Sequence, residues 1–257
     1  MDELTYILKR VLQMIPVLLV VTVAIFFGMR LIPGDPAILL VGNMASDEAI
    51  AAMRAKMGLD QPLFSQYMRF LKQCLTFDFG NSLSLKTSVT GLFAQKAQVT
   101  VSLTLMTIFF AALISIPLGC YAGTHRKKAA ARLIDSLSLF FVSIPEFLIG
   151  LVLLLVFALK LRILPAGGWG STIPEHISSL ILPSFTGALM TASLVIRNIS
   201  ENIEKILKMD YVDFARSKGL SEGKIKRSYI LHNVLIPAVT LLAMRMTAML
   251  AGSIVIE

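Results

Sequence analysis

Five stretches of the sequence are long and apolar enough to cross a membrane, and they constrain the fold more than any other feature. A helix needs about 20 residues to span roughly 30 Å of hydrocarbon, and lipid offers no hydrogen-bond partner to an open strand edge. The sequence therefore predicts an all-α fold, a polytopic transmembrane helical bundle. The five predicted spans are Val11–Met29, Ala97–Thr124, Ser136–Leu159, Ile177–Ile196 and Val234–Ile256.

The composition excludes several other classes of protein. Of the 257 residues, 56% are apolar and only 16% are charged, against about 25% charged residues in a typical soluble domain. Cys74 and Cys120 are too few for a disulfide framework. His125, His176 and His232 lie far apart and match no zinc spacing. The net charge of +8 does not indicate nucleic acid in so apolar a chain, and basic loops held in the cytoplasm explain it better.

The basic residues alternate between the two sides of the predicted bundle. Lys9 and Arg10 precede the first span, a basic cluster occupies 125–132, and the connection 197–233 carries eight Lys and Arg residues. The connection 160–176 carries only two. By the positive-inside rule, we predict that the N-terminus and the second and fourth connections are cytoplasmic.

The first connection, 31–96, faces outward in this topology and has helical patterns of its own. Ser46 is a predicted N-cap for a helix over 47–56, Gly58 is a predicted stop, and Pro62 begins a second amphipathic helix. Two interpretations remain open. The segment is either a small folded cap on the membrane face or a docking surface for an extracytoplasmic partner.

The fourth connection, 197–233, is predicted to form a helical elbow. Leu207, Tyr211, Phe214 and Ala215 fall on one face of a helix that would extend the fourth span, and Gly219 interrupts it. A basic helix follows and leads into the fifth span. Such an elbow is suited to entering a groove on a cytoplasmic partner, and the alternative is a solvated basic loop.

Two charged residues lie inside predicted spans. Glu146 and Arg245 each fall near the middle of a span, where a lone charge costs at least about 2.5 kcal/mol on insertion scales. They either pair with each other or with a second subunit, or they line a cavity that meets a charged substrate. Pro145 precedes Glu146 and would free a backbone carbonyl there.

The elbow resembles a known motif. Asp213, Phe214 and Ala215, followed by Gly219 and then by Leu-Ile-Pro at 235–237, resemble the EAA loop of ABC importer permeases, with Asp in place of Glu and Phe in place of the first Ala. The phrase at 215–221, Ala-Arg-Ser-Lys-Gly-Leu-Ser, resembles the branch that transports dipeptides, oligopeptides and nickel. Further blocks in the same order extend the resemblance from about residue 6 to residue 257.

The resemblance implies a single permease domain over 1–257 with the type I fold of ABC importers, in a bacterial or archaeal cytoplasmic membrane. It implies a second permease subunit, two ABC ATPase subunits that bind ATP and Mg, and an extracytoplasmic substrate-binding protein. The implied substrate is a dipeptide or oligopeptide, with nickel or a metal–chelator complex as the alternative.

The resemblance also implies roles for individual residues. The coupling residues toward the ATPase would be Tyr211, Asp213, Phe214, Ala215 and Gly219. The pathway candidates are Pro145, Glu146 and Arg245. No catalytic, cofactor-binding or metal-binding residue is expected in the chain, so it would be a transport subunit and not an enzyme.

Two further features bear on these expectations. The phrase at 219–225 is one residue short of a phosphate-binding P-loop and lacks its hydroxyl residue, so the chain is not expected to bind ATP. The segment 252–257 resembles a family motif that normally precedes a sixth span. Either the natural protein continues beyond Glu257, which is the interpretation we favour, or this permease lacks its last helix. A channel would not need the elbow, and a membrane-embedded enzyme would need clustered His, Asp or Ser inside the spans.

Overall fold

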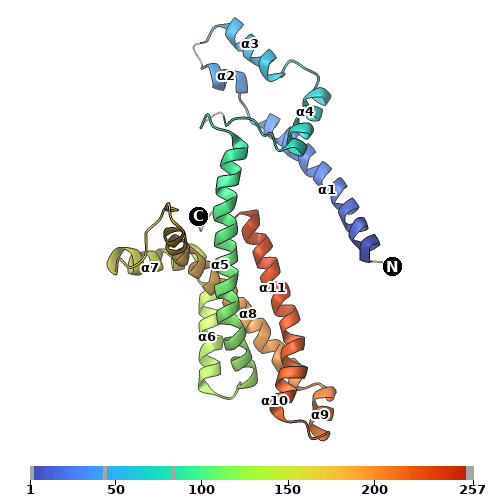
Figure 1. Cartoon of the computed structure of the whole chain (residues 1–257), viewed down its shortest axis with the longest axis vertical. Coiled ribbons are helices and arrows are strands. Elements are labelled where there is room, and N and C mark those ends of the chain that lie inside the picture. Colours follow the sequence, from blue (N-terminus) through green and yellow to red (C-terminus); the bar gives the residue numbers. More distant parts are fainter. Residues whose placement is uncertain (1–2, 43–44, 83–84, 253–257) are drawn as a thin grey trace. The chain divides into compact units, whose positions relative to one another are not determined.

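The computed structural model of the chain describes residues 3–42, 45–82 and 85–252. Within these ranges the secondary structure is helical, apart from one isolated antiparallel bridge between Asn81 and Ser88. The predicted all-α fold is therefore confirmed for the described residues. Among the described residues, four helices are long and apolar enough to cross a membrane, and a bent helix pair makes five if it counts as one span. The chain divides into two compact units, Met1–Gln95 and Lys96–Glu257 (Figure 1).

The first unit consists of one long apolar helix and three short ones. These are α1 (Glu3–Leu31), α2 (Pro36–Val41), α3 (Asp47–Met57) and α4 (Leu63–Thr76). Phe26 of α1 is only 5% exposed, and its ring lies 5.3 Å from that of Tyr67 and 5.8 Å from that of Phe70. The guanidinium of Arg30 lies 3.6 Å from the centre of the Phe26 ring. The amphipathic face of α4 thus packs against the end of α1.

Local capping fixes the short helices, as the sequence predicted. The Ser46 hydroxyl accepts a hydrogen bond from the backbone N–H of Ala49, and Gly58 ends α3 with a left-handed φ of 68°. Asp35 caps α2 by accepting from the N–H of Ala37 at 2.9 Å, and Arg54 Nε donates to it at 2.6 Å. These two hydrogen bonds hold the pKa of the Asp35 carboxyl below its usual value, because both favour its charged form.

The second unit is built around α8. Its helices are α5 (Val89–Thr124, which begins in the first unit), α6 (Ala129–Ser143), α7 (Glu146–Leu153), α8 (Ile173–Leu207), α9 (Asp210–Ser217), α10 (Glu222–Ile225) and α11 (His232–Ala251), with π-helical turns η1 (Leu154–Lys160) and η2 (Lys226–Leu231). In α8, 61% of the most apolar stretch is buried, against 28% in α5 and 17% in the continuous α10–α11 helix. Helix α8 is therefore the central helix of this unit.

Helix α5 approaches α8 closely because two glycines face it. A Cβ at Gly119 would lie 2.9 Å from the side chain of Ile199, and one at Gly123 would lie 2.7 Å from Ile203. Real Cβ atoms do not lie this close to a neighbouring atom, so both positions require glycine, which has no side chain. Small residues spaced four apart allow backbones to approach in membranes, and here both isoleucines are fully buried.

The third predicted span is not one continuous helix, and this part of the prediction is wrong. Helices α6 and α7 meet at an angle of 102°, with the break between Ser143 and Glu146. Pro145 causes it: proline has no N–H to donate to the turn before it, and it disfavours helical backbone at the preceding residue. Ile144 is accordingly extended, with φ −92° and ψ 134°. The apolar run was long enough to span, but the proline divides it.

We expect Gly123→Ala to lower the thermal stability of the protein in detergent. Overpacking costs about 1–3 kcal/mol, which exceeds the gain of about 0.5–1 kcal/mol from replacing a helical glycine by alanine. The melting temperature should fall, and Ile203→Val in the same chain should restore part of the loss. The matched control is Gly28→Ala in α1, where a Cβ meets nothing within 4 Å. Equal melting temperatures for the two single variants would contradict the close contact.

Candidate functional site

The elbow after the fourth span is a separate helix rather than an extension of α8. Helix α8 ends at Leu207, and α9 begins at Asp210 after Met209, whose backbone is extended with φ −85° and ψ 142°. The predicted continuous helix is therefore wrong at this point. The spacing of apolar residues in the sequence continues from α8 into α9, so it gave no sign of the break between the two helices.

Helix α9 has a buried and an exposed face. Val212 and Ala215 are buried in one apolar cluster with Ile225, Ile230 and Val234. These last residues belong to α10, η2 and α11, so the inner face of α9 rests on the start of the last spanning helix. Helix α9 and the start of that helix therefore share one buried apolar cluster.

The exposed face carries three of the five predicted coupling residues. Phe214 is 60% exposed, and Tyr211 and Asp213 are also exposed. The Nζ of Lys218 lies 4.6 Å from the centre of the Phe214 ring. Ala215, which the prediction placed with them, lies on the inner face instead. The side chains available to a partner are therefore the aromatic pair and its charged neighbours.

Gly219 ends α9 in the left-handed conformation, with φ +77°. Its N–H donates to the carbonyl of Arg216 at 2.9 Å, and the N–H of Leu220 donates to that of Ala215 at 3.2 Å. A Cβ at this position would meet nothing within 4 Å. Glycine is therefore required by the backbone conformation, which is unfavourable for other residues, and not by lack of space.

Arg216 joins α9 to α10, a role that the sequence analysis did not assign. Its Nε donates to Oε1 of Glu222 at 2.8 Å, and its Nη1 donates to Oδ1 of Asp213 at 3.0 Å. The bond to Glu222 is the main reason why the pKa of Arg216 is raised. The spacing of Asp213 and Arg216, three residues apart on a helix, was a visible signal, but Glu222 is brought close only by the turn at Gly219.

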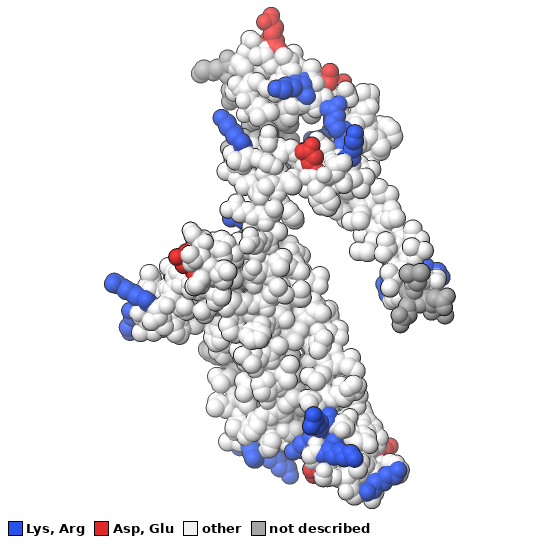
Figure 2. Space-filling view, in the orientation of Figure 1, with Lys and Arg blue, Asp and Glu red and all other residues white. Residues whose placement is uncertain are grey.

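Basic side chains gather at the end of the second unit where α9 and α10 lie (Figure 2). The turn between α5 and α6 is at the same end, because Arg126 Nη2 lies 3.2 Å from Oε2 of Glu204 in α8. The middle of this unit shows almost no charge on the visible face (Figure 2). This distribution of charge along the unit is typical of a membrane protein with one basic side.

A cavity of about 630 Å³ is lined by Glu146, one of the three pathway candidates, but not by Pro145 or Arg245. Its lining comes from α5, α7, the segment after η1 and α8, and it includes Lys96, Glu146, Phe147, Trp169 and Thr186. Trp169 is stacked on His176, with ring centres 4.3 Å apart. The cavity is mostly apolar with a few polar groups, as is usual in small-molecule sites.

Glu146 is the first residue of α7, directly after Pro145 at the N-cap. Arg245 lies in α11 and acts electrostatically on Glu146. No ion pair joins these two side chains in the structure. Both are half-buried. Glu146 contributes to the cavity wall, whereas Arg245 is not among the residues that line it.

The described residues were also considered as metal ligands. In the part of the chain that is described, no three His, Cys, Asp or Glu side chains are grouped closely enough to hold an ion. Cys74 and Cys120 are both free. The closing motif that ends at Glu257 includes residues 253–257, which lie outside the described ranges.

Comparison with known proteins gives two family matches that together cover nearly the whole chain. Residues 115–257 match the binding-protein-dependent transport system inner membrane component, and residues 3–104 match the N-terminal region of the same kind of component. The glutathione transport system permease protein GsiC of Salmonella paratyphi A is 36% identical over 254 residues, which are 99% of this chain and 81% of that protein. The GsiC proteins of Salmonella typhi and Escherichia coli K12 are 35% and 33% identical over the same shares.

We expect Arg216→Gln to loosen the elbow without unfolding the unit. Exposed ion pairs contribute about 0–1 kcal/mol each, so losing two should speed amide hydrogen exchange in α9 and α10 several-fold, while exchange in α8 stays unchanged. Arg227→Gln is the control, because it removes the same charge from an exposed position nearby. If amide exchange in α9 and α10 is the same in both variants, the hydrogen bonds of Arg216 to Asp213 and Glu222 do not hold the elbow.

Proposed function

The chain belongs to the family of binding-protein-dependent transport system inner membrane components and is a permease subunit of an ABC importer of the peptide type; on that basis we propose that α9 couples it to a separate ATPase. The observation that carries the proposal is the two-faced elbow. An exposed Phe214 and Tyr211 are mounted on a helix whose other face is buried against α10, η2 and α11. An exposed aromatic pair on a fixed helix suits insertion into a groove.

The coupling residues in this proposal divide into two roles. Tyr211, Asp213 and Phe214 contact the ATPase, while Ala215 and Gly219 hold α9 in position. When ATP closes the ATPase dimer, α9 moves with it and biases the spans toward one of two arrangements. To shift such an equilibrium from 1:99 to 99:1, the ATP-bound state must be favoured by about 5.5 kcal/mol. A rigid elbow is needed, since a mobile one would dissipate the movement.

The assembly that we propose contains a second permease, two ABC ATPases holding ATP and Mg, and an extracytoplasmic binding protein. The basic end of the second unit faces the cytoplasm, in agreement with the positive-inside rule, and this orientation gives a cytoplasmic N-terminus. The elbow is then on the same side as the ATPases. The chain's own residues supply the membrane path and the coupling contact.

We propose short peptides as the substrate, and the cavity beside Glu146 as part of the path. The relatives named above are glutathione permeases, and glutathione is itself a small peptide. Glu146 and Lys96 line the same cavity with opposite charges, which suits a molecule with an ammonium and a carboxylate. Pro145 fixes the bend that brings Glu146 there, and Arg245 acts on it electrostatically.

The direct test is reconstitution of the purified importer with its binding protein in vesicles. We expect ATP-dependent uptake of a labelled di- or tripeptide, including glutathione, and peptide stimulation of ATP hydrolysis. Uptake of Ni²⁺ or a metal–chelator complex without peptide uptake would replace peptide by the alternative cargo. ATP-independent flux would contradict the importer mechanism altogether.

We expect Gly219→Val to abolish uptake while the protein still inserts into the membrane. A β-branched residue at φ +77° is strained even though the space is open, so the end of α9 must change. Gly223→Val is the matched control, because it also faces open space but has no positive φ. Gly219→Asn should retain part of the activity, since Asn tolerates the left-handed region. Normal peptide-stimulated ATPase activity in Gly219→Val would refute the role of this turn.

A further inference from the structure

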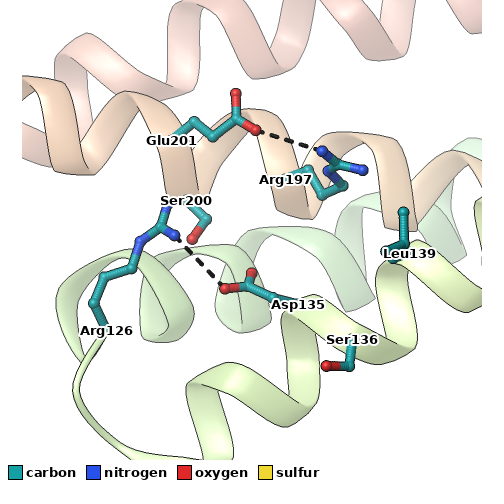
Figure 3. Close-up of a pocket in the computed structure, with 7 residues that line it drawn as sticks. All are labelled: Arg126, Asp135, Ser136, Leu139, Arg197, Ser200 and Glu201. Carbon is teal, nitrogen blue, oxygen red and sulfur yellow. Dashed lines mark ion pairs between the residues drawn. The ribbon is translucent and has the colours of Figure 1, made fainter.

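A second, polar pocket of about 310 Å³ lies between α6 and α8 at the basic end of the unit. Figure 3 shows its lining from three elements: Arg126 from the turn after α5, Asp135, Ser136 and Leu139 from α6, and Arg197, Ser200 and Glu201 from α8. Its position differs from that of the cavity beside Glu146, and the two share no lining residue. The coupling and transport roles proposed above do not use it.

The two arginines in this pocket keep hydrogen-bond donors for a ligand. Arg126 Nη1 lies 3.8 Å from Oδ2 of Asp135, and Arg197 Nη2 lies 3.8 Å from Oε1 of Glu201. Both separations are too long for hydrogen bonds, and each guanidinium carries five N–H donors. Arg126 Nη2 also lies 3.2 Å from Oε2 of Glu204, so Arg126 keeps fewer free donors than Arg197. The carboxylates thus hold both arginines near the pocket without using all of their N–H groups.

Ser200 is one of five buried Ser and Thr residues in the described part of the chain whose hydroxyl has no hydrogen-bond partner, and it is the one of the five that lines this pocket. The residue is only 1% exposed, yet its hydroxyl has no hydrogen-bond partner in the structure. A buried hydroxyl without a partner costs about 1–3 kcal/mol. Since Ser200 lines the pocket, an acceptor atom of a ligand placed beside the arginines would supply the missing hydrogen bond.

The charges of the lining select the kind of ligand. Arg126 and Arg197 suit an anionic group, whereas Asp135 and Glu201 suit a cationic one. A simple anion would be repelled by the carboxylates, and a simple cation by the guanidiniums. A ligand that carries both an anionic group and an ammonium matches both halves.

The surroundings indicate that this ligand is attached to the membrane. The uncharged run of α5 ends at Thr124, two residues before Arg126, so the pocket is at the depth of lipid headgroups. Leu139 at its edge is 53% exposed, and Leu137 and Phe140 beside it on α6 are exposed as well. This apolar surface can receive acyl chains while the pocket receives their headgroup.

We propose that the pocket binds the headgroup of phosphatidylethanolamine. Its phosphate accepts hydrogen bonds from Arg126, Arg197 and Ser200, and its primary ammonium donates to Asp135 and Glu201. Pockets with basic side chains between membrane helices are known headgroup sites. The bound lipid joins α6 to α8 close to Glu204, which pairs with Lys208 just before the elbow. The proposal needs only the membrane location of the chain and not its coupling role.

The test measures which lipids stay bound to the importer. The full chain, purified with its partner subunits, is equilibrated with micelles containing equal amounts of phosphatidylethanolamine, phosphatidylglycerol and phosphatidylcholine, and bound lipids are counted by native mass spectrometry. We expect retained phosphatidylethanolamine in preference to the other two. The variant R126Q/R197Q should weaken its binding at least about tenfold, as the loss of charge-assisted hydrogen bonds predicts. Ser200→Ala should weaken it less.

Two further variants make the test specific. K127Q/R132Q removes the same charge from the same end outside the pocket and should leave binding unchanged. D135N/E201Q keeps the arginines but removes the carboxylates that would bind the ammonium, so its lipid preference should change to phosphatidylglycerol. This variant still tests the proposal if R126Q/R197Q does not fold. Three results would each overturn the proposal. The first is an equal loss of phosphatidylethanolamine binding in R126Q/R197Q and K127Q/R132Q. The others are a preference of the wild-type protein for phosphatidylglycerol and displacement of the lipid by a soluble dipeptide.

Discussion

Helix α8 is packed on several sides, and the second unit depends on that packing. Gly119 and Gly123 let α5 approach until their backbone meets Ile199 and Ile203, while α6 and α11 also pack against α8. In lipid there is little hydrophobic gain from joining helices, so close van der Waals contact must supply the attraction. The two glycines make that contact possible.

The same packing connects the membrane part with the elbow. The buried cluster runs from Ala188 and Val195 in α8 through Ile206 to Val212 and Ala215 in α9, and on to Val234 in α11. Because Val212 and Ala215 are buried in this cluster, α9 is part of the core and not a loose loop. In the coupling that we propose, a movement of α9 would have to repack its contacts with both adjoining spans, because tightly packed interiors do not deform freely.

Local patterns in the sequence were enough for the helices and their caps but not for their arrangement. Apolar length identified four spanning helices but missed the bend in the third predicted span, and Ser46, Gly58 and Gly219 act where the sequence placed them. The face of α9 that is buried depends on contacts with Ile225 and Val234, which no local pattern contains. The polar pocket likewise needs Arg126 and Ser200 to meet across two helices. Helix boundaries are local properties, whereas faces and pockets arise from tertiary contacts.

The bend at Pro145 has a consequence for what surrounds it. A spanning helix hides its own polar backbone, but the break of 102° interrupts the helical hydrogen bonding at the extended residue Ile144, while the Pro145 carbonyl accepts from the N–H of Leu148 at 3.0 Å. In hydrocarbon, each backbone N–H or C=O without a hydrogen-bond partner costs several kcal/mol. Non-helical backbone at membrane depth is therefore tolerated only against protein or water. At membrane depth this corner must therefore be turned away from the lipid, so the bend marks a side of the chain that faces protein or water.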